Sequence, residues 1–72
     1  MPRYFFHVRD GRLVFDDATG EMHPTRRAAE AKAAQLASEL AADGETYSGY
    51  NVIVTDDHGN EIARVPVAPV RH

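Results

Sequence analysis

The sequence predicts an α+β domain of the order ββαββ, in which one helix packs on one face of a four-stranded, mostly antiparallel sheet. Three observations lead to this fold class. The chain opens with two apolar runs joined by Asp10-Gly11, a strong short-range signal for a β-hairpin. An alanine-rich segment with helical spacing follows, and a second pair of strand-like runs closes the chain.

The first hairpin is predicted to pair residues 3–9 with residues 12–17 through a type I′ turn at Asp10-Gly11. Because side chains alternate along a strand, this turn sets two faces. The face predicted to meet the helix pairs Val8 with Leu13, Phe6 with Phe15 and Tyr4 with Asp17. The opposite face pairs His7 with Val14 and Phe5 with Asp16. Residues 18–23 are predicted to be a linker with a turn at Thr19-Gly20.

The helix is predicted over residues 26–43, with Thr25 as its N-cap and Gly44 as its left-handed C-terminal cap. The segment is rich in Ala, Leu, Glu, Lys and Gln, which are all good helix formers. Its apolar stripe recurs at spacings of three and four and consists of Ala29, Ala33, Leu36, Ala37 and Leu40. Because alanine is small, this stripe lets the helix approach the sheet closely.

The second hairpin is predicted to pair residues 50–55 with residues 61–67 across a turn at 56–60, with Gly59 in the left-handed conformation. Pro66 indicates that the last strand lies at an edge. With Thr55 opposite Ile62, the helix-facing set is Tyr50, Val52, Val54, Ala63, Val65 and Val67. The opposite face then carries Ile53, Ile62 and Arg64. Residues 69–72 are predicted to fray.

One helix cannot cover both faces of this sheet, so the far face is the candidate interaction surface. It is predicted to carry five residues: Phe5, His7, Val14, Ile53 and Ile62. Apolar residues grouped on an exposed sheet surface usually mark an interaction site. A symmetric homodimer joined through this face, or through edge strands, would hide the patch and supplement a small core.

Length and composition favour one small domain over residues 1–72 that is soluble and cytoplasmic. A chain of 72 residues buries only about 60% of its unfolded surface, so self-association is a simple source of added stability. The absence of cysteine removes disulfides and fits a reducing compartment. The sequence has neither a signal-peptide core nor an apolar run of membrane length. A net charge of −3 disfavours nucleic acid as the default partner.

No catalytic residue, cofactor or metal ligand is predicted from the motifs. His7 could act as an acid, a base or a ligand, but the sequence shows no partner set for it. The run Asp56-Asp57-His58-Gly59-Asn60-Glu61 is rich in oxygen ligands, yet its spacing fits a hairpin turn and not a calcium loop. The motifs of zinc proteases, α/β-hydrolases and phosphate-binding loops do not occur.

A resemblance extends over nearly the whole chain. The run Met1-Pro2-Arg3-Tyr4-Phe5-Phe6-His7-Val8-Arg9-Asp10-Gly11 is its most specific part. With Pro24 before the alanine-rich helix and residues 52–61, it resembles a family of short uncharacterised proteins frequent in alphaproteobacteria, classed as a domain of unknown function. The resemblance implies the fold and a bacterial origin, and it carries over no catalytic residue.

The sequence therefore predicts a non-enzymatic interaction or assembly module that forms a homodimer or binds another protein. One alternative is a nucleic-acid-binding accessory protein, since Tyr4, Phe5 and Phe6 lie on a strand and aromatic side chains on a sheet can stack bases. The alternation sends two of these rings under the helix, which weakens that alternative. A third possibility is a metal-binding or enzymatic site formed across a dimer that brings two His7 side chains together.

Overall fold

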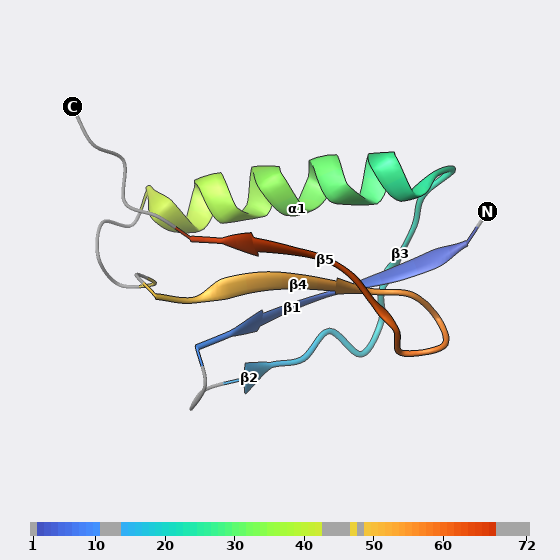
Figure 1. Ribbon diagram of the computed structural model, residues 1–72, viewed down its shortest axis with the longest axis horizontal. Helices are drawn as coiled ribbons and strands as arrows, with labels where there is room; N and C mark the ends of the chain where they lie inside the picture. Colours follow the sequence, from blue (N-terminus) through green and yellow to red (C-terminus); the bar gives the residue numbers. More distant parts are fainter. Residues whose placement is uncertain (1, 11–13, 43–46, 48, 68–72) are drawn as a thin grey trace.

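The computed structural model describes residues 2–10, 14–42, 47 and 49–67. These form β1 (Arg3–Arg9), β2 (Val14–Phe15), β3 (Glu21–Met22), α1 (Arg26–Ala41), β4 (Asn51–Thr55) and β5 (Glu61–Pro66). Strands β2, β1, β4 and β5 lie in that order in one open antiparallel sheet, and β3 pairs with the other end of β1 (Figure 1). The predicted ββαββ fold with a single helix is confirmed.

Strand β1 lies inside the sheet, where its alternating side chains separate the two faces. Tyr4 and Phe6 are buried on the face that α1 covers. On the other face, Phe5 lies opposite Thr55 and His7 lies opposite Ile53 in the ladder with β4. The predicted bounds of this strand, residues 3–9, are confirmed.

The first hairpin has a different register from the predicted one. Val8 pairs with Phe15, and Arg9 pairs with Val14, so the ladder is shifted by two residues. An even shift keeps Phe15 on its predicted face but moves it from Phe6 to Val8. The connection between the paired residues is therefore four residues long, at positions 10–13, and positions 11–13 lie outside the described residues, as does the predicted partner Leu13.

Strand β2 is shorter than predicted because a side chain replaces the strand backbone as a hydrogen-bond partner. The backbone N–H of Phe6 donates to Oδ2 of Asp17 at 3.2 Å. Residues 16–20 bend away from β1, and the chain returns to pair Glu21 with Tyr4 and Met22 with Arg3. The expected linker at 18–23 thus contains β3, a short element that the sequence analysis did not predict.

Helix α1 begins at Arg26 as predicted, and Oγ1 of its N-cap Thr25 accepts from the Ala28 N–H at 3.1 Å. It ends at Ala41, two residues before the predicted end, and the predicted cap at Gly44 lies outside the described residues. Its buried face is a row of small side chains: Ala29, Ala33, Ala37 and Ala41. Leu36 and Leu40 pack against the same core and remain partly exposed.

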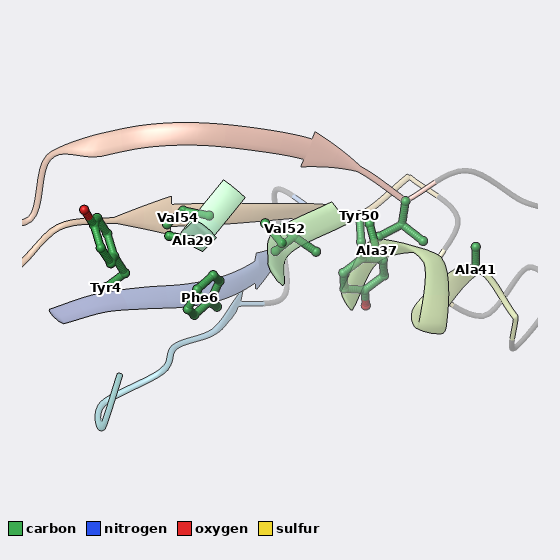
Figure 2. Close-up of a cluster of buried hydrophobic side chains, with 10 residues drawn as sticks. Tyr4, Phe6, Ala29, Ala37, Ala41, Tyr50, Val52 and Val54 are labelled. Carbon is green, nitrogen blue, oxygen red and sulfur yellow. The ribbon is translucent and has the colours of Figure 1, made fainter. Parts of the chain in front are cut away.

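The core lies between α1 and the sheet (Figure 2). Val52 and Val54 of β4 are its largest side chains with no exposed surface. The alanine row of α1 packs over β4 and β5, which places the helix toward one side of the sheet (Figure 1). The larger aromatic volume comes from Tyr4 and Phe6 of β1 and from Tyr50, which precedes β4.

The second hairpin follows the predicted register except at its turn. Val54 pairs with Ala63 as predicted, but Thr55 pairs with Glu61 and not with Ile62. The turn is closed by the Asp56 N–H donating to the Asn60 carbonyl, which aligns Thr55 with Glu61 and leaves Ile62 as an extra residue in a β-bulge. Gly59 is left-handed at φ +84°, and β5 lies at an edge, as predicted.

Candidate functional site

The five residues of the predicted interaction surface are not one exposed apolar patch. Ile53 is only 2% exposed, and the His7 side chain is 12% exposed. Phe5 is half-buried. Ile62 packs against the helix-side core, because it occupies the bulge, so its predicted place on the far face is wrong. The Val14 backbone pairs with Arg9, and its side chain lies outside the described part of the chain.

His7 connects β4 to the segment that follows β2. Its Nε2 lies 3.0 Å from Oγ1 of Thr55, and its Nδ1 lies 3.1 Å from the backbone nitrogen of Asp17. A backbone nitrogen carries a hydrogen and can only donate, so Nδ1 must be the acceptor. The neutral ring therefore carries its proton on Nε2 and donates it to Thr55.

Asp17 organises the bend between β2 and β3. Its Oδ1 accepts from the backbone N–H groups of Thr19 at 3.1 Å and Gly20 at 3.0 Å, while Oδ2 accepts from that of Phe6. Partial burial opposes the charge on Asp17. The hydrogen bonds from Gly20, Phe6 and Thr19 outweigh it, with a smaller contribution from His7, so the pKa of Asp17 lies below its usual value.

Thr55, His7 and Asp16 are the residue types found in catalytic triads, with a hydroxyl nucleophile, a histidine base and a carboxylate. Oδ1 of Asp16 lies 3.4 Å from Nδ1 of His7, on the same nitrogen that accepts from Asp17. A base that activates Thr55 would need an unprotonated Nε2, whereas the Asp17 N–H selects the opposite tautomer. The hydrogen-bond geometry therefore assigns His7 a structural bridging role.

The second histidine of the sheet region, His23, packs against aromatic rings on the helix side. Its ring lies 6.2 Å from that of Tyr4 and 5.7 Å from that of Phe6, centroid to centroid. Its Nε2 lies 3.2 Å from Oε1 of Glu21. Helix α1 packs mainly over β4 and β5, and His23 adds ring contacts to Tyr4 and Phe6 of β1.

At the other end of β1, an aromatic strip consisting of Phe15, Tyr47 and Tyr50 lies on the helix side. Phe15 stacks on Tyr50 with centroids 6.4 Å apart and ring planes 29° apart, and Tyr47 meets Tyr50 edge-on at 5.4 Å. Burial and the neighbouring Asp10 carboxylate raise the pKa of Tyr50. Phe15 is 53% exposed, which makes it the most exposed large apolar side chain of the described residues.

The acidic run at 56–60 forms a turn. Oδ1 of Asp56 accepts from the backbone N–H groups of His58 and Asn60, both at 2.9 Å. These hydrogen bonds hold the pKa of Asp56 below its usual value, and the bond from Asn60 makes the largest contribution. In the part of the chain that the structure describes, no three His, Asp or Glu side chains are grouped so that they could hold a metal ion.

Sequence reasoning missed Asp17 and the exposed position of Phe15. Asp17 is predicted only as the strand residue opposite Tyr4, but the sequence does contain a signal for its role. Asp followed two and three residues later by Thr19 and Gly20 is the pattern of an Asx turn, in which the carboxylate accepts from the next backbone N–H groups. No comparable signal marks Phe15, because its exposure depends on where the helix lies.

The fold and these contacts define a small α+β domain with an open antiparallel sheet and one helix. The family model of a domain of unknown function (DUF6894) matches residues 3–68, and the chain therefore belongs to this family. No curated protein and no solved structure matches the chain. Among the described residues, no helix has the length and apolar character needed to cross a membrane.

Proposed function

We propose that the domain is a non-enzymatic protein-interaction module that pairs with a second copy of itself through the aromatic strip. The observation that carries this proposal is the exposure of Phe15, of which 53% is accessible although it lies on the same face as the core. Aromatic side chains are enriched at protein interfaces, and a ring already stacked on Tyr50 loses little conformational freedom on binding.

The sheet edges support a face-to-face contact over strand addition. One edge is made of the two-residue strands β2 and β3, separated by the bend at 16–20. The other edge, β5, contains a bulge and ends at Pro66, and Nη2 of Arg26 donates to the Ile62 carbonyl at 2.6 Å. Bulges, proline, charged side chains and short edge strands all oppose edge-to-edge pairing.

The choice of a second copy follows from the size of the domain. A chain of 72 residues has a small core, and its helix contributes mainly alanine. A twofold contact of Phe15 with Phe15 of the second copy would bury apolar surface at one self-complementary site. A bacterial cytoplasmic origin belongs to the same proposal. It is supported by the resemblance of the opening run and by the cysteine-free composition.

The test is sedimentation analysis of the purified protein over a range of concentrations, at low and high salt. We expect the wild-type protein to form a dimer that persists at high salt. The Phe15→Gln substitution is expected to shift this equilibrium toward the monomer. Met22→Gln is the matched control. Met22 is 45% exposed and lies on the same edge of the sheet, but it pairs with Arg3, so its side chain lies on the opposite face from Phe15. Circular dichroism checks that both variants remain folded.

A wild-type protein that stays monomeric throughout, or equal effects of the two substitutions, would overturn the proposal. Ile53→Glu is not a suitable probe of the interface, because a residue that is 2% exposed has almost no surface to contribute. A monomer that binds nucleic acid with an affinity falling steeply as salt rises would support the nucleic-acid alternative instead.

A further inference from the structure

The Nδ1 atom of His7 faces two groups with opposite requirements. The backbone N–H of Asp17, 3.1 Å away, needs an acceptor, whereas the Asp16 carboxylate, 3.4 Å away, needs a donor. One nitrogen can satisfy only one of them at a time. The neutral ring satisfies Asp17, and the protonated ring can satisfy only Asp16.

We propose that protonation of His7 switches the start of the segment of residues 16–20, at Asp16 and the Asp17 N–H, between two arrangements. In the neutral arrangement, Nδ1 accepts from the Asp17 N–H and holds the segment against β1. In the protonated arrangement, Nδ1 carries a hydrogen that faces the hydrogen of Asp17, so this contact breaks and Nδ1–H donates to Asp16. The Nε2–H bond to Thr55 is available in both arrangements and anchors the ring to β4.

The charges around His7 come from three elements. Asp16 and Asp17 place two carboxylates on the segment itself, and the Asp17 N–H is the donor that faces Nδ1. Arg9, two residues along β1, competes for Asp16 with Nη2 at 3.5 Å from Oδ1. Beyond Ile53 on the far face, β5 carries Arg64 paired with Glu61 at 3.0 Å. From β4, the group that meets the ring is the neutral hydroxyl of Thr55.

The remaining contacts limit the change to one end of the segment. Asp17 keeps three backbone N–H donors on its carboxylate, and none of them involves Nδ1. Phe15 directly precedes Asp16, so a change at Asp16 and Asp17 alters the backbone next to the aromatic strip. This last link rests on the proposed function, whereas the switch itself does not.

The test is NMR of ¹⁵N-labelled protein over the range in which imidazoles titrate, around pH 5–8. At the upper end, the ring nitrogen shifts are expected to show hydrogen on Nε2 and none on Nδ1. As pH falls, the Asp17 amide resonance is expected to move with the titration of His7. Its hydrogen-exchange protection, corrected for the intrinsic rate at each pH, is expected to fall by about tenfold.

His7→Gln and His23→Gln provide the comparison, because both remove a partly buried histidine. The Asp17 change should disappear in His7→Gln and persist in His23→Gln. Hydrogen on Nδ1 at high pH would overturn the proposal, and so would an Asp17 amide that does not follow His7. If His7→Gln fails to fold, the wild-type tautomer and the two titration curves still decide the matter. A monomeric wild type would reject the proposed function and leave this test unaffected.

Discussion

Among the glycines that the structure describes, Gly20 is the one at which an added methyl group should be most destabilising. Its backbone has φ +74°, and an added Cβ would lie 2.8 Å from the Phe5 ring and 2.9 Å from the Tyr4 carbonyl. We expect Gly20→Ala to lower the free energy of unfolding by about 1–2 kcal/mol for the left-handed backbone and about 1–3 kcal/mol more for the clash. Urea unfolding measures both contributions together.

Gly59→Ala is the matched control, because Gly59 has φ +84° and open space around its Cβ position. It should cost only the backbone contribution of about 1–2 kcal/mol. Equal losses for the two alanine variants would contradict the close packing of residues 16–20 onto Phe5.

Asp17 should stabilise the fold through its charge. In Asp17→Asn, the amide cannot accept from three N–H groups as the carboxylate does, so we expect a loss of about 1–3 kcal/mol at pH 7. Because the folded-state pKa is lowered, the wild-type contribution is present above the usual pKa and is lost as pH falls through the folded-state value. The difference in free energy of unfolding between the wild type and Asp17→Asn should therefore become smaller at acidic pH.

Unfolding in urea at neutral and acidic pH measures this difference. Asp57→Asn is the control, because the Asp57 side chain is 57% exposed in the turn before β5 and should change stability by less than about 0.5 kcal/mol. An Asp17→Asn variant as stable as the wild type at pH 7 would show that the three hydrogen bonds contribute nothing net.

At the scale of elements, helix α1 depends on small side chains where it meets the sheet. Ala33 has no exposed surface, so Ala33→Leu adds volume that the packed core cannot accept. We expect a loss of about 1–3 kcal/mol, measured by thermal and urea unfolding. Ala34→Leu places the same side chain on the exposed neighbour and should be close to neutral. Similar effects for both variants would mean that the helix is not close to the sheet.

The sequence was sufficient to predict the elements that carry their own local signals. Strand β1 has an uninterrupted run of strand-forming residues, and the start of α1 is marked by Thr25 before an alanine-rich periodic segment. Both were predicted at their observed starting residues. The turn before β5 was also recognised, because Asp56 and Gly59 are residues that favour turns.

Elements stabilised by distant contacts were not predictable in the same way. Strand β3 has two residues and no strand pattern of its own, and it forms because the bend at Asp17 returns the chain to β1. The bulge at Ile62 likewise depends on how the turn closes, which the alternation of apolar residues does not encode.

At the scale of the whole molecule, the position of α1 determines which surface remains open. The helix packs over β4 and β5 (Figure 1). The His23 ring packs against the rings of Tyr4 and Phe6 in the first half of β1. The opposite end of β1 carries the aromatic strip, with Phe15 exposed. The exposed aromatic surface is therefore on the helix side of the sheet, beside the helix, whereas Ile53 on the far face is buried.

If the aromatic strip joins two copies, folding and association are linked, and stability must depend on concentration. A partner that binds only the folded state adds about 2.7 kcal/mol when its concentration is 100 times the Kd. For a domain of this size, each kcal/mol corresponds to about 4–8 °C in Tm. We expect the Tm of the wild type to rise with protein concentration and that of Phe15→Gln to stay constant, as followed by circular dichroism. Met22→Gln should retain the wild-type dependence, because it leaves the strip intact. A wild-type Tm that is independent of concentration would mean that the folded domain is monomeric, and would contradict pairing through Phe15.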